Sequence, residues 1–231
     1  MKKIVLSLFA FALLISAKAQ TAEEIISKHI EAIGGADNWR KVNSVKMEGV
    51  LQVQGAEVAV TITVLHNKGM RQDISVMGMT GYEFVTPTEG WSFMPFQGQQ
   101  EPEAMTAEKL AESQDQLDAQ GNLVDYAQKG HSAEYLGKED VEGTECFKIR
   151  LNKKGGTHET MFIDPKTFYV LQSKTVQKAN GQEMEVTSTF ANYEKLPEGI
   201  VIAKSITLPF GEMVLGKVTI NGPVEESVFK K

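Results

Sequence analysis

The chain has 231 residues, of which 42% are hydrophobic and 23% charged, and its formal net charge at pH 7 is −6. This length can bury a sizeable core, and because no Pro-, Gly- or Ser-rich linker divides it we expect one domain, residues 20–231. The acidic balance argues against nucleic acid as a partner and against simple adsorption to anionic lipid. Cys146 is the single cysteine, so an intrachain disulfide is excluded and stability must come from the hydrophobic core.

Residues 1–19 have the pattern of a secretory signal peptide. Lys2 and Lys3 form a basic start, residues 4–17 form an apolar run, and the Ala-Lys-Ala of residues 17–19 is a cleavage site. The apolar run is too short to cross a bilayer as a helix. Cleavage after Ala19 removes three lysines and no acidic residue, which takes the net charge from −6 to −9. Since no cysteine follows to carry a lipid, we expect an exported, soluble monomer with only transient membrane contact.

An amphipathic helix is predicted for residues 21–33. Thr21 and Glu24 have capping-box spacing, and Gly34-Gly35 allow the helix to end. Its apolar stripe, which we expect to pack on a sheet, consists of Ala22, Ile25, Ile26, His29, Ile30 and Ile33.

Four or five strands are predicted between residues 44 and 93, because apolar and polar residues alternate there. Gly55 and the Asn-Lys-Gly of residues 67–69 supply turns between the first runs. Methionine and aromatic side chains become more frequent along the segment. We assign its apolar side chains to one dry face and expect this face to line a cavity, with the members Met47, Leu51, Val60, Ile62, Met70, Ile74, Tyr82, Phe84, Trp91 and Phe93.

Residues 95–102 lack any period and predict a loop, and residues 106–119 predict a helix capped by Thr106. The apolar stripe of this helix is thin, with Leu110 and Leu117 as its large members. A buried leucine contributes roughly 1.5–3 kcal/mol, whereas ordering the backbone costs roughly 1–2 kcal/mol per residue. Two interpretations remain, a weakly held lid over a cavity and an ordinary connecting helix.

The second half of the chain is an antiparallel meander that starts near residue 133. In residues 144–151, Phe147, Ile149 and Leu151 alternate with Cys146, Lys148 and Arg150. Turns at Gly155-Gly156 and Asp164-Pro165 separate this strand from two more, and strands follow at 182–194, 200–208 and 212–221. About eleven antiparallel strands indicate a strongly curved sheet or barrel. The predicted cavity lining from this half consists of Phe147, Ile149, Phe162 and Phe190.

The sequence has no pattern typical of catalysis. The four histidines, at positions 29, 66, 131 and 158, are scattered without metal-ligand spacing, and there is no nucleophile motif or phosphate loop. His158 and Glu159 fall on opposite faces of one strand. We therefore expect no catalytic residue, metal site or cofactor. The apolar side chains either fill a tightly closed core or line a cavity for an apolar ligand, for which methionine and aromatic residues are well suited.

Three local sequences resemble a known family. They are the Pro-Thr-Glu-Gly-Trp-Ser-Phe-Met-Pro of residues 87–95, the Met-Phe-Ile-Asp-Pro-Lys-Thr-Phe-Tyr-Val of residues 161–170, and the Ala-Ile-Gly-Gly of residues 32–35. With the export signal and the first helix, they make the chain similar to the LolA and LolB lipoprotein-carrier superfamily over essentially all of its mature length. The third pattern resembles outer-membrane lipoprotein-sorting proteins of Bacteroidetes-type bacteria.

This resemblance implies an unclosed, helix-capped half-barrel in the periplasm, whose interior takes the acyl chains of lipoproteins bound for the outer membrane. Its partners would be a releasing complex in the inner membrane and an acceptor in the outer membrane. The family's carrier holds its lid shut with an arginine at the end of an early strand, for which His66, Lys68 and Arg71 are the candidates here. An alternative is a sensing or interaction module on the same scaffold, which binds a partner protein or an envelope lipid without transporting it.

Overall fold

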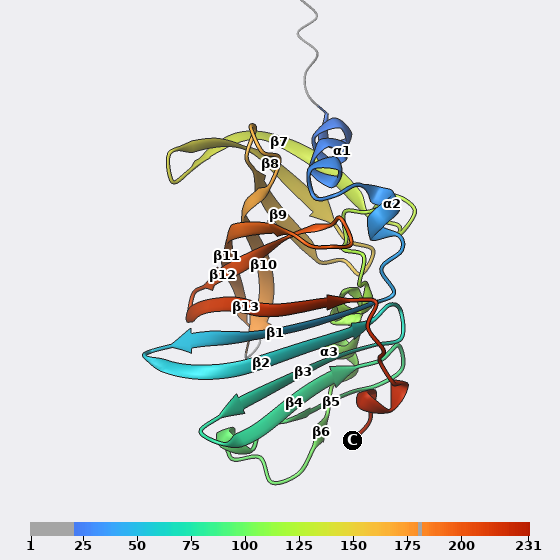
Figure 1. The fold of residues 1–231 in the computed structure, drawn as a ribbon, viewed down its shortest axis with the longest axis vertical. Coiled ribbons are helices and arrows are strands. Elements are labelled where there is room, and N and C mark those ends of the chain that lie inside the picture. The colour runs from blue at the N-terminus through green and yellow to red at the C-terminus, as the bar shows by residue number, and fades with distance from the viewer. Residues whose placement is uncertain (1–20, 180–181) are drawn as a thin grey trace, which may run out of the picture.

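A computed structural model describes residues 21–179 and 182–231 (Figure 1). The expected signal peptide lies outside these residues. Within them the protein is mainly β, with one thirteen-stranded antiparallel sheet and few helices. The predicted class, a large open antiparallel sheet with an N-terminal helix, is confirmed.

The helical elements are α1 (Ala22–Ala32), α2 (Ala36–Trp39), η1 (Pro95–Gln97), α3 (Ala107–Glu112), η2 (Gln114–Leu117) and η3 (Glu226–Phe229), where η denotes a 3-10 helix. The strands are β1 (Ser44–Val53), β2 (Ala56–Leu65), β3 (Gly69–Val76), β4 (Met79–Val85), β5 (Gly90–Phe93), β6 (Glu103–Ala104), β7 (Ser132–Val141), β8 (Thr144–Asn152), β9 (His158–Ile163), β10 (Val170–Ala179), β11 (Gln182–Lys195), β12 (Val201–Leu208) and β13 (Gly211–Ile220).

The strand order shows why the sheet stays open. Strands β1 to β6 run from the middle of the sheet to one edge, and β7 to β13 return from the other edge until β13 pairs with β1. Residues 105–131, called here the crossover segment, connect the two edges. The count of thirteen exceeds the predicted eleven partly because β6 has only two residues, too few for an alternating pattern to reveal.

Helix α1 forms as the capping box predicts. The Thr21 hydroxyl accepts a hydrogen bond from the Glu24 amide (3.1 Å), and the Glu24 carboxylate accepts one from the Thr21 amide (3.3 Å). Beyond the helix, Gly34 has φ +111°, and a Cβ there would lie 2.3 Å from the carbonyl oxygen of Gly199. Only glycine therefore allows the chain to pass this closely against the turn between β11 and β12.

The crossover segment departs from its predicted form. A single helix over residues 106–119 is wrong, because α3 ends at Glu112 and the 3-10 helix η2 follows. Ser113 lies at the break, and its hydroxyl donates to the Lys109 carbonyl (2.8 Å), a local bond of the kind that competes with regular helix. Leu117 is buried and Leu110 half-buried, and both belong to a core with Met70 and Val85 of the sheet.

The sheet has an inner face, which carries α1 and the crossover segment, and an outer face on the opposite side. The predicted single dry face is wrong here. Phe84 pairs with Arg71 and Trp91, so its side chain lies opposite to Met70, which pairs with Val85. The aromatic residues of this part of the outer face are Tyr82, Phe84, Trp91 and Phe93.

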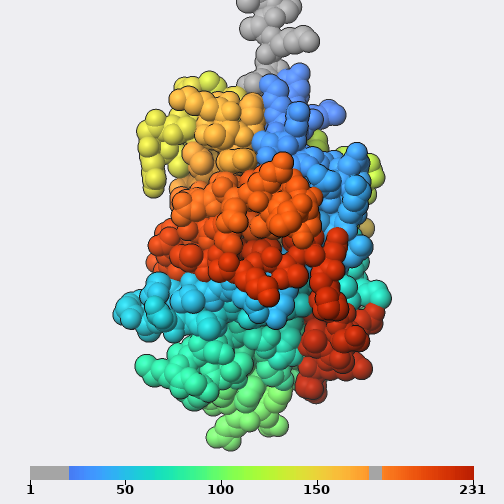
Figure 2. All heavy atoms as spheres, viewed as in Figure 1, coloured from blue at the N-terminus to red at the C-terminus, as the bar shows by residue number. Residues whose placement is uncertain are grey.

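The C-terminal residues lie over one end of this aromatic part of the outer face (Figure 2, red). Helix η3 packs on β3, with the Phe229 ring against Gly69. The Lys231 ammonium lies 3.2 Å from the centre of the Trp91 ring, and the Arg71 guanidinium lies 4.3 Å from that of Tyr82. These side chains belong to a separate, outer packing layer.

A second correction concerns Phe162. It pairs with Lys148, whereas Phe147 pairs with Ile163, so Phe162 and Phe147 lie on opposite faces. On the outer face Phe162 packs with Cys146, and burial raises the pKa of the Cys146 thiol to about 11. The buried, protonated thiol fits the structural role expected for it.

Candidate ligand-binding cavity

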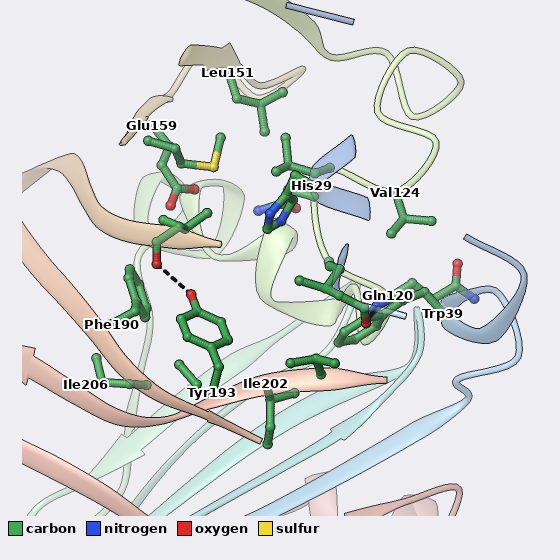
Figure 3. Close-up of a pocket in the computed structure, with 18 of the residues that line it drawn as sticks. His29, Trp39, Gln120, Val124, Leu151, Glu159, Phe190, Tyr193, Ile202 and Ile206 are labelled. Atoms are coloured by element: carbon green, nitrogen blue, oxygen red, sulfur yellow. Dashed lines mark hydrogen bonds between the residues drawn. The ribbon is translucent and has the colours of Figure 1, made fainter. Parts of the chain in front are cut away.

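A cavity of about 370 Å³ lies on the inner face, between α1, the strands β8 to β13 and residues 120–124 of the crossover segment (Figure 3). Pockets for small molecules typically measure about 300–1,000 Å³. Its wall is formed by His29, Ile33, Trp39, Met47, Gln120, Gly121, Asn122, Leu123, Val124, Leu151, Glu159, Met161, Val170, Phe190, Tyr193, Val201, Ile202, Ala203, Ile206 and Leu215.

The strands β11 and β12 supply most of the apolar floor, including Phe190, Ile202 and Ile206. In a regular strand, residues three positions apart face opposite sides. Phe190 and Tyr193 nevertheless both line the cavity, because Asn192 between them has a left-handed φ of 55° that breaks the alternation.

Three polar side chains of the wall use their hydrogen-bond donors on backbone carbonyls. Trp39 Nε1 donates to Ile33 (3.0 Å), and the Tyr193 hydroxyl donates to Val170 (2.6 Å). Gln120 Nε2 donates to the carbonyls of residues 40 and 42, at 3.1 and 3.4 Å. Burial raises the pKa of the Tyr193 hydroxyl, so it remains protonated. The donors of these three side chains are therefore committed to the protein itself.

His29 extends from α1 into the wall (Figure 3). Its Nδ1 lies 2.7 Å from the carbonyl oxygen of Phe168, and burial lowers the pKa of the imidazole below its ordinary value. The ring is therefore neutral near pH 7, with its proton on Nδ1 facing the carbonyl and a lone pair on Nε2.

Glu159 brings a carboxylate into the wall from β9. It pairs with Leu151 on the inner face, as strand parity predicts. The nearest cation is the Lys153 ammonium, 3.6 Å from the Glu159 carboxylate, and the same ammonium lies 3.5 Å from the Asp115 carboxylate. One lysine is thus shared between two acids, and neither contact is short.

The sequence-predicted cavity residues are distributed over three places. Met47 and Phe190 line the cavity. Seven more lie on the inner face outside its wall, namely Leu51, Val60, Ile62, Met70, Ile74, Phe147 and Ile149. Five lie on the outer face, namely Tyr82, Phe84, Trp91, Phe93 and Phe162.

Sequence reasoning missed the rest of the wall. Alternation in residues 200–208 was visible and could have suggested Ile202 and Ile206. Residues 120–124 have no period, so no local signal marks them. The predicted lid residues Leu110 and Leu117 pack on the neighbouring part of the inner face.

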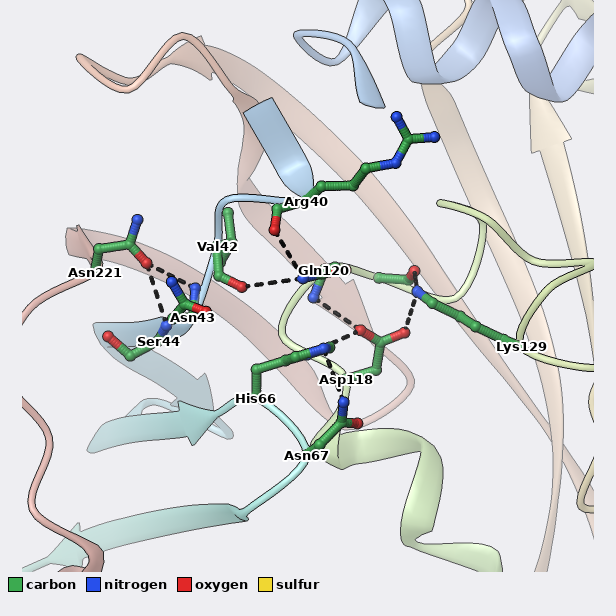
Figure 4. A network of polar contacts seen from close by, with 11 residues as sticks. Arg40, Val42, Asn43, Ser44, His66, Asn67, Asp118, Gln120, Lys129 and Asn221 are labelled. Atoms are coloured by element: carbon green, nitrogen blue, oxygen red, sulfur yellow. Dashed lines mark hydrogen bonds and ion pairs between the residues drawn. The ribbon is translucent and has the colours of Figure 1, made fainter. Parts of the chain in front are cut away.

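A polar network holds the crossover segment against the turn between β2 and β3 (Figure 4). Asp118 lies 2.5 Å from the Lys129 ammonium and 3.4 Å from Nδ1 of His66. The Asn67 amide donates to the Leu117 carbonyl (2.8 Å). Among the three basic candidates for a latch, His66 therefore contacts the crossover segment.

The other two candidates bind near the C-terminus instead. Lys68 forms an ion pair with Glu226, and Arg71 donates to the Val228 carbonyl (3.0 Å) and pairs with Asp73. The Lys68–Glu226 pair joins the turn before β3 to η3, and the Arg71–Val228 hydrogen bond joins β3 to η3.

Comparison with known proteins identifies the architecture. No protein-family model matches the chain, and no curated protein sequence matches it significantly. Among solved structures, a LolA superfamily protein from Nitrosomonas europaea superposes with a TM-score of 0.58 and 12% identity, over 92% of this chain and 99% of that one. The chain has a LolA-like fold.

Two further structures agree with the LolA-like fold. A domain described as an outer membrane lipoprotein-sorting protein, from Vibrio parahaemolyticus, gives a TM-score of 0.54 and 16% identity, over 89% of this chain and 94% of that one. A DUF1329 family protein from Desulfovibrio piger gives a TM-score of 0.56 and 14% identity, over 90% of this chain and 97% of that one. At these identities the similarity shows the fold, and the predicted resemblance is confirmed at that level.

Two further findings concern residues 21–179 and 182–231. No helix there has the length and apolar character needed to cross a membrane. No group of three metal-ligand side chains comes together in the same residues.

Proposed function

We propose that the protein is a non-enzymatic periplasmic carrier, which binds the acyl chains of lipoproteins or similar lipids in this cavity for transfer to the outer membrane. The observation that carries the proposal is the largely apolar cavity of about 370 Å³, which lies between the inner face and a segment that connects the two sheet edges. The LolA-like fold supports it, since one structural neighbour is described as a lipoprotein-sorting protein.

The energetics of the cavity suit reversible binding. Each buried methylene contributes about 0.8 kcal/mol, so a chain of about ten methylenes gains about 8 kcal/mol before the cost of immobilisation. We expect the ligand to enter past the crossover segment, because residues 120–124 form part of the wall and Asp118 contacts the turn between β2 and β3 through His66, at 3.4 Å. Water can replace such contacts when the segment moves, whereas the paired strands must stay in register.

The test is mass spectrometry of organic extracts from gently purified mature protein, compared with a variant whose cavity is filled. Ala203→Trp places a large ring in the wall, and Ala191→Trp, at an exposed position of β11, is the matched control. We expect acyl lipid to co-purify with the native protein and with Ala191→Trp, and to be lost from Ala203→Trp.

Acyl lipid retained by the filled variant would place binding elsewhere and contradict the proposal. A tight stoichiometric protein complex with an empty cavity would instead favour the sensing or interaction module.

A further inference from the structure

The cavity wall has an uneven supply of hydrogen-bonding groups. The donors of Trp39, Gln120 and Tyr193 are directed to backbone carbonyls. Two acceptors, by contrast, have no hydrogen-bond partner among residues 21–179 and 182–231, the Glu159 carboxylate and Nε2 of His29. The Asn122 amide, which can donate or accept, is the remaining polar side chain of the wall. A ligand entering this cavity therefore meets mainly acceptors.

The charged groups near these acceptors also favour a ligand that donates hydrogen bonds. Lys153 lies 3.6 Å from Glu159 and 3.5 Å from Asp115, so one positive charge is shared by two negative ones. The side chain of Lys153 is only 13% exposed, and its position between the two acids leaves it poorly placed to turn toward a ligand. A carboxylate brought into this cavity would be repelled by Glu159, and none of the described residues of the wall is a lysine or arginine that could offset this repulsion.

The acceptors and the apolar floor occupy different sides of the cavity. In Figure 3, Glu159 and His29 lie on the side of α1 and β9, whereas Phe190, Ile202 and Ile206 lie on the side of β11 and β12. An elongated amphiphile can place its head at the first side and its chain along the second.

We propose that Glu159, with Nε2 of His29, forms a head-group site that selects acyl compounds whose polar head donates hydrogen bonds, such as amides and amines, over free fatty-acid carboxylates. The inference rests on the proposed function and names the chemical class of its ligand. An amide N–H or an ammonium reaches an unsatisfied acceptor in a partly desolvated wall, while a fatty-acid carboxylate offers no donor.

The experiment uses three ligands with the same chain, dodecylamine, dodecanamide and dodecanoate. Each is titrated calorimetrically into the mature protein at about pH 7.5, below its aggregation concentration. A hydrogen bond to a charged group corresponds to about tenfold or more in affinity, so we expect the amine and the amide to bind at least about tenfold more tightly than dodecanoate.

Substitution then assigns the preference to Glu159. In Glu159→Gln, and in Glu159→Leu as a second replacement, the advantage of dodecylamine over dodecanoate should fall to about twofold, because the negative acceptor is gone. Glu139→Gln is the control, since Glu139 lies at the surface in an ion pair with Lys148 and is absent from the wall. It should keep the full preference, which excludes a general effect of removing one negative charge.

The outcomes separate this inference from the proposed function. Equal affinity for the three ligands, a preference for dodecanoate, or a preference unchanged in both Glu159 variants would overturn the head-group site while leaving the acyl-binding cavity in place. Failure of all three ligands to bind would overturn the acyl-binding cavity and the head-group site with it.

Discussion

Asp118 joins two parts of the crossover segment through Lys129 and contacts the turn between β2 and β3 through His66, and its replacement by asparagine gives a quantitative test. The carboxylate lies 2.5 Å from the Lys129 ammonium and 3.4 Å from Nδ1 of His66. It also accepts a hydrogen bond from the backbone amide of Gln120 (3.0 Å). Asparagine keeps an oxygen for the Gln120 amide and removes the charge. Lys129 then retains its bond to the Gly121 carbonyl (2.9 Å) and loses its ionic partner.

The expected cost follows from the burial of the pair. Breaking a fully buried ion pair by removing one partner costs about 3–5 kcal/mol, and an exposed pair contributes about 0–1 kcal/mol. The side chains of Asp118 and Lys129 are 12% and 23% exposed, which lies between these limits. After a discount for solvent screening, we expect about 1–3 kcal/mol.

Most of this loss should appear as local opening of the crossover segment. Hydrogen exchange measured by mass spectrometry should be faster by about 5- to 100-fold for peptides covering residues 114–124, and unchanged in β8 and β9. Glu145→Gln, which breaks the exposed pair with Lys138, is the control and should leave exchange in both regions as it is. Equal protection of residues 114–124 in the native protein and Asp118→Asn would refute the idea that this network holds the segment.

Three further predictions follow from other parts of the structure. Trp39 lines the cavity and Trp91 lies under Lys231, so dodecanamide should change the fluorescence of Trp91→Phe and leave that of Trp39→Phe unaltered; the reverse would place the ligand elsewhere. Burial lowers the pKa of His29 below 6.5, so the unfolded chain binds more protons there and stability falls as pH drops below that value. Between about pH 7 and about pH 5, the free energy of unfolding should fall less in His29→Gln than in the native protein. Part of the fall should remain, because the pKa of His131 is also lowered. An equal fall in both proteins would contradict this prediction. Gly34→Ala should lower the free energy of unfolding by about 2 kcal/mol or more, whereas Gly155→Ala, with open space around its Cβ position, should change it by about 0.5 kcal/mol or less in urea melts.

Much of the fold could be predicted because its signals are local. The capping box of Thr21 and Glu24 set the start of α1, and glycine turns separated strands whose alternation was clear. These features depend on residues a few positions apart. The antiparallel meander of the second half was also predicted, whereas the pairing of β13 with β1 and the crossover to the opposite edge required the structure.

The assignment of faces failed where it depended on register between strands. Tyr82 and Phe84 do share a face with Trp91 and Phe93, as their spacing suggested. Alternation alone does not say whether that face is the one that carries Met70. A register shift of one residue in a hairpin moves the side chains of the second strand to the opposite face of the sheet. Two C-terminal residues pack on this part of the outer face, Phe229 at Gly69 and Lys231 at Trp91. Both are far away in sequence from the residues they contact, so no local pattern indicates these contacts.

The cavity was the feature that the sequence predicted least well. Its wall combines strands β8 to β13 with Trp39 and an aperiodic stretch, residues 120–124. His29 was placed in the apolar stripe of α1, and Glu159 on the face opposite to His158, but nothing in the sequence indicated that the two meet the same cavity. That relation arises because α1 packs across the strands that carry Glu159.

The central claim, that acyl chains bind between the crossover segment and the strands β11 to β13, can be tested by locating a heavy atom on the chain. Crystals of residues 20–231 grown with 12-bromododecanamide would reveal the bromine by its anomalous scattering. The account predicts a single bromine site among Phe190, Ile206 and Leu215, at the apolar side of the cavity. A bromine on the outer face or at the C-terminal segment, or an empty cavity beside a bound ligand, would contradict it.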